Sequence, residues 1–255
     1  MDLRNVSSRA KSALRACADA WQKGGAGEVR RVVAEAAYWR FHPRVRRWRA
    51  ELPRQQAIDE AFDRRWGVDT AGEVPLADVG ISDDDLDRGH GLYRPVWTEV
   101  FNEAVRALPV VLDRFTFLDY GSGKGKALLL ASEFPFAQVI GIEFARPLHE
   151  VAERNVTRYA SPTRRCADVR SLCADALTYE PPASPLVCFF FNPFDDATTD
   201  AVVRRLVDSV RAEPREVFVL YSNMRDVAEH KAAFRARKGL ELVEERPRWL
   251  LYRVG

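Results

Sequence analysis

The chain has 255 residues, of which 47% are hydrophobic, and this composition supports one packed domain with an additional segment. Its formal net charge is only +2 at pH 7, so the overall charge favours neither nucleic acid nor a membrane surface as a partner. A polyanion would need a local basic patch.

Cysteine usage and the N-terminus narrow the class of protein further. The four cysteines contain no C-x-x-C pair and lie mostly in apolar stretches, which predicts reduced thiols and neither a metal site nor a disulfide framework. Residues 1–23 alternate charged residues with alanine and lack a continuous apolar run, so we expect no signal peptide and no membrane anchor. These features predict a cytoplasmic protein.

The first part of the chain is predicted to be a helical extension or lid that ends in a linker. Hydrophobic residues recur at helical spacing in residues 7–22 and 28–41, and two further helix-like runs follow between prolines. Glycine, aspartate and proline then dominate residues 67–91, which show little periodicity. We place a domain boundary in this segment, so that the extension comprises residues 1–80 and the second domain residues 81–255.

The second domain alternates predicted strands and helices. The strand candidates are apolar, β-branched and aromatic stretches at residues 115–120, 137–143, 168–173, 186–191 and 215–221. Helical patterns occur at residues 94–108, 126–134, 147–156, 198–210 and 225–237. This alternation predicts an α/β fold with a mostly parallel sheet covered on both faces. Residues 240–254 then read as two extended runs of an antiparallel hairpin.

A glycine-rich turn, GSGKG at residues 121–125, connects the first of these strands to a helix. Glycine lets the backbone approach a ligand closely, and the free N–H groups at the start of the helix favour an anionic group. The dinucleotide fingerprint would need glycine at position 126, which is Lys126, and the P-loop spacing is also absent. The turn therefore predicts a site for an anion other than phosphate, with Lys124 and Lys126 pointing outward.

The D-x-G-x-G-x-G spacing that starts at Asp119, with Glu143 at the end of the next strand, resembles the class I S-adenosylmethionine-dependent methyltransferases. The resemblance covers residues 93–255. It implies a Rossmann-like, mostly parallel seven-stranded sheet with a C-terminal antiparallel hairpin. It also implies S-adenosylmethionine as the cofactor.

The same resemblance assigns roles to residues of the glycine turn and its neighbours. Gly121, Ser122 and Gly123 would hold the methionine part of the cofactor, and Asp119 would accept a hydrogen bond from its ammonium group. Glu143 would bind both ribose hydroxyls, because an acid about 20 residues past the glycines lies beside the turn at the carboxyl edge of the sheet.

Further residues complete the expected cofactor site. Asp175, which precedes Ala176 after the third strand, is at the position where the family contacts the adenine amino group. Phe144 and Tyr93 are aromatic candidates for contact with the sulfonium, a cation that favours aromatic faces. Tyr93 would act as a lid on the cofactor, and an ordinary packed tyrosine is the alternative at equal weight.

Two residues are candidates for catalysis, and one of them, Asn192, is also expected at the cofactor, facing the methyl group to be transferred. Asn192 opens the segment NPFD, which resembles a shortened Asn/Asp-Pro-Pro-aromatic step of amino-directed methyltransferases, where carbonyl groups accept hydrogen bonds from the target nitrogen. The missing second proline leaves nitrogen specificity open, and a turn-forming Asn-Pro step is the structural alternative. His90 is a candidate general base, because imidazole titrates near neutral pH.

These residues predict an enzyme that transfers a methyl group to nitrogen or oxygen of an unidentified acceptor. The motif sequences resemble most those of bacterial proteins distantly similar to the non-SET histone-lysine methyltransferases. The predicted helical lid, however, slightly favours a small-molecule acceptor over a protein lysine. A non-catalytic module that holds a partner through its basic helices, around residues 42–54, is the alternative. A nicotinamide-dependent oxidoreductase is a third hypothesis, which Lys126 disfavours. The sequence leaves the oligomeric state open.

Overall fold

The structure, a computed structural model, describes residues 18, 20–22, 24–34, 43–81, 91–223, 234 and 238–255. The chain divides into two compact units, Met1–Leu52 and Pro53–Gly255. Residues 24–34 are helical, and helix α2 (Pro43–Trp66) starts in the first unit and ends in the second. Within the described ranges, no helix has the length and apolar character needed to cross a lipid bilayer.

The second unit contains all the strands of the described structure. Its larger sheet consists of β3 (Thr116–Tyr120), β4 (Gln138–Glu143), β5 (Val169–Cys173), β6 (Leu186–Phe190), β7 (Val217–Ser222), β8 (Leu240–Arg246) and β9 (Trp249–Val254). The helices that pack on this sheet are α4 (Thr98–Arg106), α5 (Lys126–Ala131), α6 (Arg146–Arg158) and α7 (Asp196–Ala212). The predicted helix at residues 225–237 lies outside the described residues, apart from Phe234.

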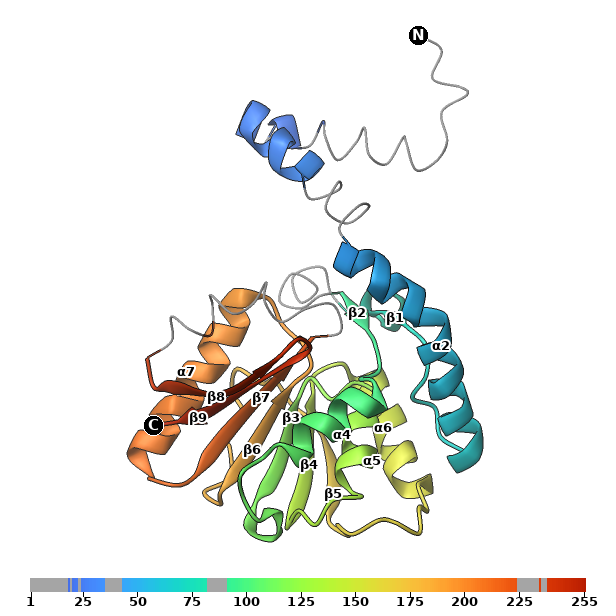
Figure 1. The fold of residues 1–255 in the computed structure, drawn as a ribbon, viewed down its shortest axis with the longest axis vertical. Helices are drawn as coiled ribbons and strands as arrows, with labels where there is room; N and C mark the ends of the chain where they lie inside the picture. Colours follow the sequence, from blue (N-terminus) through green and yellow to red (C-terminus); the bar gives the residue numbers. More distant parts are fainter. Residues whose placement is uncertain are drawn as a thin grey trace. The chain divides into compact units, whose positions relative to one another are not determined.

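The seven strands lie in the order β5-β4-β3-β6-β7-β9-β8 (Figure 1). Strands β3 to β7 pair in parallel, and β9 is antiparallel to both of its neighbours. The predicted Rossmann-like sheet with a C-terminal antiparallel hairpin is therefore confirmed. Because the strand order reverses between β3 and β6, the carboxyl edge at these strands is a topological switch point, where open α/β sheets bind their ligands.

Helices α4, α5 and α6 cover one face of the sheet and α7 covers the other (Figure 1). Phe101 of α4 packs edge-on against Phe117 and Phe189, with ring centroids 5.7 Å and 5.3 Å apart. Leu206 of α7 belongs instead to a buried cluster with Tyr120 and Phe190. Since side chains alternate along a strand, Asp119 shares its face with Phe117 and points to the side of α4 and α5.

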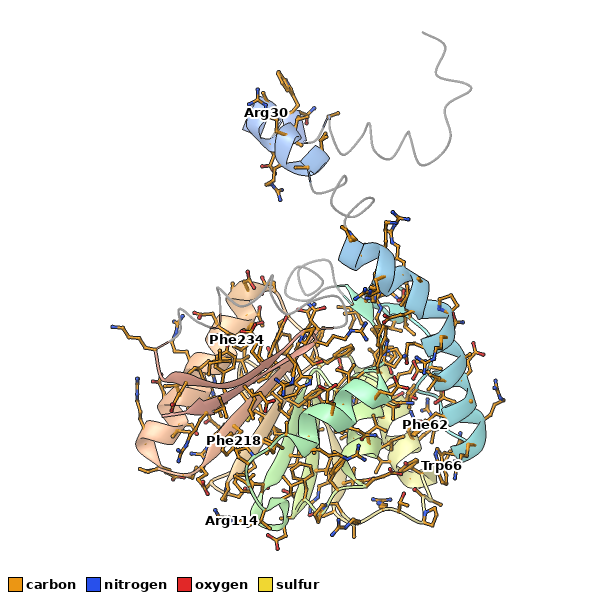
Figure 2. The ribbon with its side chains drawn as sticks, viewed as in Figure 1. Arg30, Phe62, Trp66, Arg114, Phe218 and Phe234 are labelled. Carbon is orange, nitrogen blue, oxygen red and sulfur yellow. The ribbon has the colours of Figure 1, made fainter. Side chains whose placement is uncertain are left out.

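The described residues between α2 and α4, 67–81 and 91–97, contain more regular structure than the sequence pattern predicts. Strands β1 (Val74–Pro75) and β2 (Leu92–Tyr93) pair antiparallel, and the 3₁₀ helix η2 (Leu76–Val79) follows β1. Helix α2 itself continues through Pro53. Its residues Phe62 and Trp66, which Figure 2 labels, pack against Tyr159 at the end of α6, with ring centroids 5.7 Å and 5.3 Å apart.

Strand β8 forms one edge of the large sheet and is irregular in its middle. The register with β9 shifts between Leu242 and Glu244, so that Val243 is an extra residue in β8. Leu242 and Val243 are exposed apolar side chains, at 37% and 45% of their full accessibility.

Candidate functional site

The glycine turn after β3 leaves no room for side chains. Gly121, Gly123 and Gly125 have φ angles of +77°, +52° and +82°, in the region that favours glycine. A Cβ atom on Gly121 would lie 2.5 Å from Cβ of Pro193, and one on Gly123 would lie 2.3 Å from the ring of Tyr93. The bare backbone of the turn thus meets the loop after β6 on one side and β2 on the other.

Hydrogen bonds fix the turn to the end of β4. The N–H groups of Gly121 and Ser122 both donate to the carbonyl of Ile142, at 2.9 Å and 3.0 Å, and the N–H of Gly125 donates to the carbonyl of Ser122 at 2.8 Å. The side chain of Ser122 packs close to Gly141, where a Cβ would lie 2.7 Å from it. Ser122 therefore contributes its backbone to the turn and its side chain to packing.

Glu143, the last residue of β4, lies beside this turn and is 5% exposed. Its Oε2 accepts a hydrogen bond from the N–H of Gly123 at 2.7 Å, and its Oε1 accepts one from the N–H of Ala145 at 2.9 Å. Burial raises the pKa of Glu143 from 4.5 to about 7, although these backbone N–H groups favour the ionised form. The carboxyl group is thus held rigidly and titrates near neutral pH.

Asp119 is a second buried acid on the same face of the sheet. It pairs with Gly141 of β4, two residues before Glu143, so both acidic side chains point toward α5. Asp119 is only 2% exposed. Burial, and then the charge of Glu143, raise its pKa well above the usual range. A site with two desolvated acids is suited to a ligand that brings a cation and hydroxyl donors.

A pocket opens at the carboxyl edge of the sheet, next to the glycine turn. It has a cavity volume of about 90 Å³. Most of its lining is apolar, as in small-molecule sites generally. The lining residues are Leu76, Gly121, Ile142, Phe144, Ala174, Asp175, Ala176, Leu177, Pro193, Phe194 and Thr198.

Three residues predicted for the cofactor site line this pocket together. Phe144 is 38% exposed, so part of its ring is available to a ligand. Asp175 and Ala176 lie in the loop after β5. A hydrogen bond of 2.8 Å from the N–H of Leu177 to Oδ1 of Asp175 forms a tight turn in this loop. The pocket therefore combines an aromatic face with a carboxylate at its rim.

Asn192 follows β6 and lies at the switch point. Its φ angle is +46°, the one positive value at a non-glycine position in the described part of the chain. Its Oδ1 accepts a hydrogen bond from the hydroxyl of Tyr221 at 2.5 Å. The next residue, Pro193, contacts Gly121, so the Asn-Pro step lies against the glycine turn. Sequence reasoning missed Tyr221, which is distant in the sequence and belongs to no motif.

The structure brings Tyr93 to the glycine turn but buries it. Its side chain is 8% exposed and packs in an apolar cluster with Leu76 and Leu148. Its hydroxyl donates to the carbonyl of Thr70 at 2.7 Å. Tyr93 therefore forms a wall of the turn in this structure, and its role as a lid stays a prediction.

The prediction that Lys124 and Lys126 point outward is wrong, because both side chains are buried. Nζ of Lys124 donates to Oδ1 of Asp69 at 2.8 Å. Nζ of Lys126 lies 3.6 Å from Oδ1 of Asp59 and 3.3 Å from the ring centroid of Phe62. Both lysines connect the glycine turn to α2 and the segment after it.

Of the four histidines, the structure describes only His149. His90 lies outside the described residues. His149 on α6 is buried, with Nδ1 2.9 Å from Oγ of Ser171. Among the residues with a described position, no group of three or more His, Cys, Asp or Glu side chains could hold a metal ion.

Comparisons with known proteins find similarity in structure only. No protein-family model matches the chain, and no curated protein matches its sequence significantly. The structure is similar to the 23S rRNA methyltransferase ErmE, with 15% identity and a TM-score of 0.43 over 61% of this chain and 66% of that one. It is similar to the mitomycin 7-O-methyltransferase MmcR, with 16% identity and a TM-score of 0.47 over 87% and 71%.

A third similar structure is the magnesium protoporphyrin IX methyltransferase ChlM from Synechocystis PCC 6803 with bound SAM. The match has 14% identity and a TM-score of 0.41, and it covers 62% of this chain and 77% of that one. At these identities the likeness concerns the fold alone, so the role of each residue has to rest on its own geometry.

Proposed function

We propose that the chain is an S-adenosylmethionine-dependent methyltransferase that acts on nitrogen or oxygen of an unidentified acceptor. The observation that supports this most directly is the position of Glu143. Its carboxyl group is buried at the end of β4 and fixed by the N–H groups of Gly123 and Ala145 beside the glycine turn. A carboxylate held in this way is a rigid acceptor for two adjacent hydroxyl groups of a ribose.

The glycine turn fits the amino-acid end of the cofactor. Side chains on Gly121 or Gly123 would collide with Pro193 or Tyr93, so only glycine fits at these two positions of the turn. Asp119 lies beside the turn, and burial, followed by the charge of Glu143, raises its pKa. A bound ammonium group would favour the ionised form of Asp119 and offset this repulsion.

The pocket fits the adenine end. The partly exposed ring of Phe144 offers a flat apolar face, with Ala176 also in the lining. Asp175 places a carboxylate at the same pocket, where it can accept a hydrogen bond from an exocyclic amino group. The ribose acceptor Glu143 precedes Phe144 directly in the chain, so adjacent parts of one nucleoside would meet adjacent residues.

When bound, S-adenosylmethionine supplies a methyl group on a sulfonium that departs as a neutral thioether. The chain would contribute mainly by positioning the acceptor and excluding water. Asn192, at the switch point, would present its side-chain amide to the acceptor atom. Removal of a proton from the acceptor would fall to a group such as His90, which stays a proposal from the sequence.

For the acceptor, we favour a small molecule. A protein lysine, which the similarity to the non-SET histone-lysine branch suggests, is the alternative. Leu76, which lies in η2 before β2, lines the pocket beside the glycine turn. This pocket is the one proposed for adenine, so Leu76 ties the segment before the sheet to the cofactor, and the restriction of acceptor access by residues 1–80 stays a prediction from the sequence.

Replacement of Glu143 by alanine tests the proposed cofactor. Titration calorimetry with S-adenosylhomocysteine should show binding to the wild type and an affinity about tenfold to a hundredfold lower for Glu143→Ala, because the ribose loses a charged hydrogen-bond partner. Glu150→Ala on the exposed side of α6 is the matched control and should bind normally. Equal affinity of Glu143→Ala and wild type, or no binding to folded wild type, would contradict the proposal.

A further inference from the structure

Tyr221 holds a hydroxyl group in a fixed place at the carboxyl edge of the sheet. It is the penultimate residue of β7, pairs in register with Phe190 of β6, and is only 2% exposed. Its ring packs against Phe234, labelled in Figure 2, with centroids 4.6 Å apart. A tyrosine fixed by its strand and by ring packing has little freedom, so its hydroxyl is a rigid group.

The Tyr221 hydroxyl selects one orientation of the Asn192 amide. The terminal torsion of asparagine is broad and roughly two-fold, so the amide alone has no strong preference. The 2.5 Å hydrogen bond from Tyr221 to Oδ1 turns the oxygen toward β7. A carbonyl oxygen has two lone pairs, so one lone pair and both amide hydrogens of Asn192 stay available to a ligand.

The backbone of Asn192 is itself constrained. A φ angle of +46° costs on the order of 1 kcal/mol or more for a residue with a side chain, and asparagine tolerates it better than most. The surrounding structure maintains this conformation, through the hydrogen bond from Tyr221 and the contact of Pro193 with Gly121. Strained conformations with several supports are typical of ligand sites.

We propose that Tyr221 is a positioning residue for methyl transfer, which fixes the Asn192 amide so that its free groups face the transferred methyl and the acceptor atom. This inference rests on the proposed function. It assigns Tyr221 no contact with cofactor or acceptor, since its effect passes through Asn192.

Two cofactor analogues test the inference without knowledge of the acceptor. S-Adenosylhomocysteine lacks the methyl group, whereas sinefungin carries an ammonium group on carbon at that place and can donate hydrogen bonds to Asn192. The measured quantity is the ratio of the two dissociation constants for each variant, from titration calorimetry. Asn192→Ala should reduce the preference for sinefungin about tenfold, and Tyr221→Phe about threefold to tenfold, while the affinity for S-adenosylhomocysteine stays within about twofold.

The double variant separates positioning from a general structural effect. If Tyr221 acts through Asn192, then Tyr221→Phe should change the ratio little in the Asn192→Ala background, because the two effects are coupled. Tyr252→Phe is the matched control: Tyr252 on β9 also stacks on Phe234, with centroids 5.5 Å apart, and the ratio should be that of the wild type. Thermal unfolding verifies that each variant is folded.

The outcomes distinguish the two proposals. Wild-type protein that binds neither analogue would overturn the proposed function and this inference with it. Normal binding with an unchanged ratio in Tyr221→Phe would overturn the positioning role alone, as would additive effects in the double variant. Parallel weakening of both analogues would assign Tyr221 a merely structural role and would also overturn the inference.

Discussion

At the scale of single residues, two buried carboxyl groups dominate the electrostatics of the candidate site. Glu143 has a pKa of about 7, and burial, followed by the charge of Glu143, raises the pKa of Asp119 well above its usual range. A raised folded-state pKa means that each carboxyl contributes stability at low pH, and that this contribution is lost as pH rises through the folded-state value. Ionisation of these buried acids therefore destabilises the ligand-free protein as pH rises.

Cofactor binding should depend on pH in the opposite direction. Ribose hydroxyls and an ammonium group bind the ionised acids, so the affinity for S-adenosylhomocysteine should increase from pH 6 to pH 8, by up to about tenfold for each unit below the pKa of Glu143. Calorimetry and the thermal shift on binding should both show this trend. A flat profile over this range would contradict it, and Glu143→Ala should reduce the slope.

The sequence predicts the acids of the site better than the residues that support them. Asp119 and Glu143 have fixed distances from the glycines, so strand ends and spacing suffice to place them. Tyr221 donates a hydrogen bond to Asn192 across 29 residues of sequence, and Lys124 donates one to Asp69 across 55 residues. No local pattern marks such long-range pairs, and a lysine after a strand suggests solvent by default.

At the scale of elements, the chain from α2 to residue 71 holds the glycine turn in place. Asn155 of α6 donates from Nδ2 to the carbonyls of both Asp69 and Lys124, each at 2.8 Å. Asp63 accepts hydrogen bonds from the N–H groups of Thr70 and Ala71. Side-chain hydrogen bonds, and not a helix or strand, therefore fix residues 67–71. Such a segment has no hydrophobic periodicity in its sequence, so the sequence predicts only a linker there.

The buried pair of Lys126 and Asp59 should be sensitive to loss of one partner. Burial raises the pKa of Asp59 from 3.8 to about 6 and lowers that of Lys126 from 10.5 to about 8. Both groups are therefore still charged at pH 7, although burial disfavours their charged forms. Lys126→Met should lower the free energy of unfolding by about 3 kcal/mol, because it leaves an unpaired buried acid. The double variant Asp59→Leu, Lys126→Met should recover most of this loss in urea unfolding.

Lys124→Met is the matched comparison for this experiment. Its partner Asp69 has a side chain that is 64% exposed, so the pair is screened by water and should contribute less than about 1 kcal/mol. A larger effect at Lys124 than at Lys126 would contradict the assignment of the buried pair as the stronger coupling between α2 and the turn.

At the scale of the whole molecule, the candidate site belongs entirely to one compact unit. Every described residue proposed here for cofactor or acceptor lies in Pro53–Gly255. The fold of this unit was predictable because hydrophobic alternation and strand-end motifs recur through it. The sequence before this unit has helical periodicity and basic charge but no functional motif. It therefore predicts helices there and predicts no function for them.

A chain that begins at Pro53 should retain cofactor binding. Proline is well tolerated at the start of a helix, so the remaining part of α2 can form from this residue. We expect its affinity for S-adenosylhomocysteine to lie within about twofold of the full chain, measured by calorimetry after thermal unfolding has shown a cooperative transition. Loss of binding by a folded truncated chain would show that the first unit takes part in the site.

The extra residue in β8 has a consequence for the behaviour of the protein at high concentration. An edge strand offers unpaired N–H and C=O groups to any neighbouring chain, and the exposed Leu242 and Val243 would add apolar contact. The bulge at Val243 breaks the regular spacing of those groups, and Glu241 and Glu244 flank the apolar residues with like charges. Strand addition along this border is thereby discouraged, which protects the molecule from growth into intermolecular sheets and aggregates.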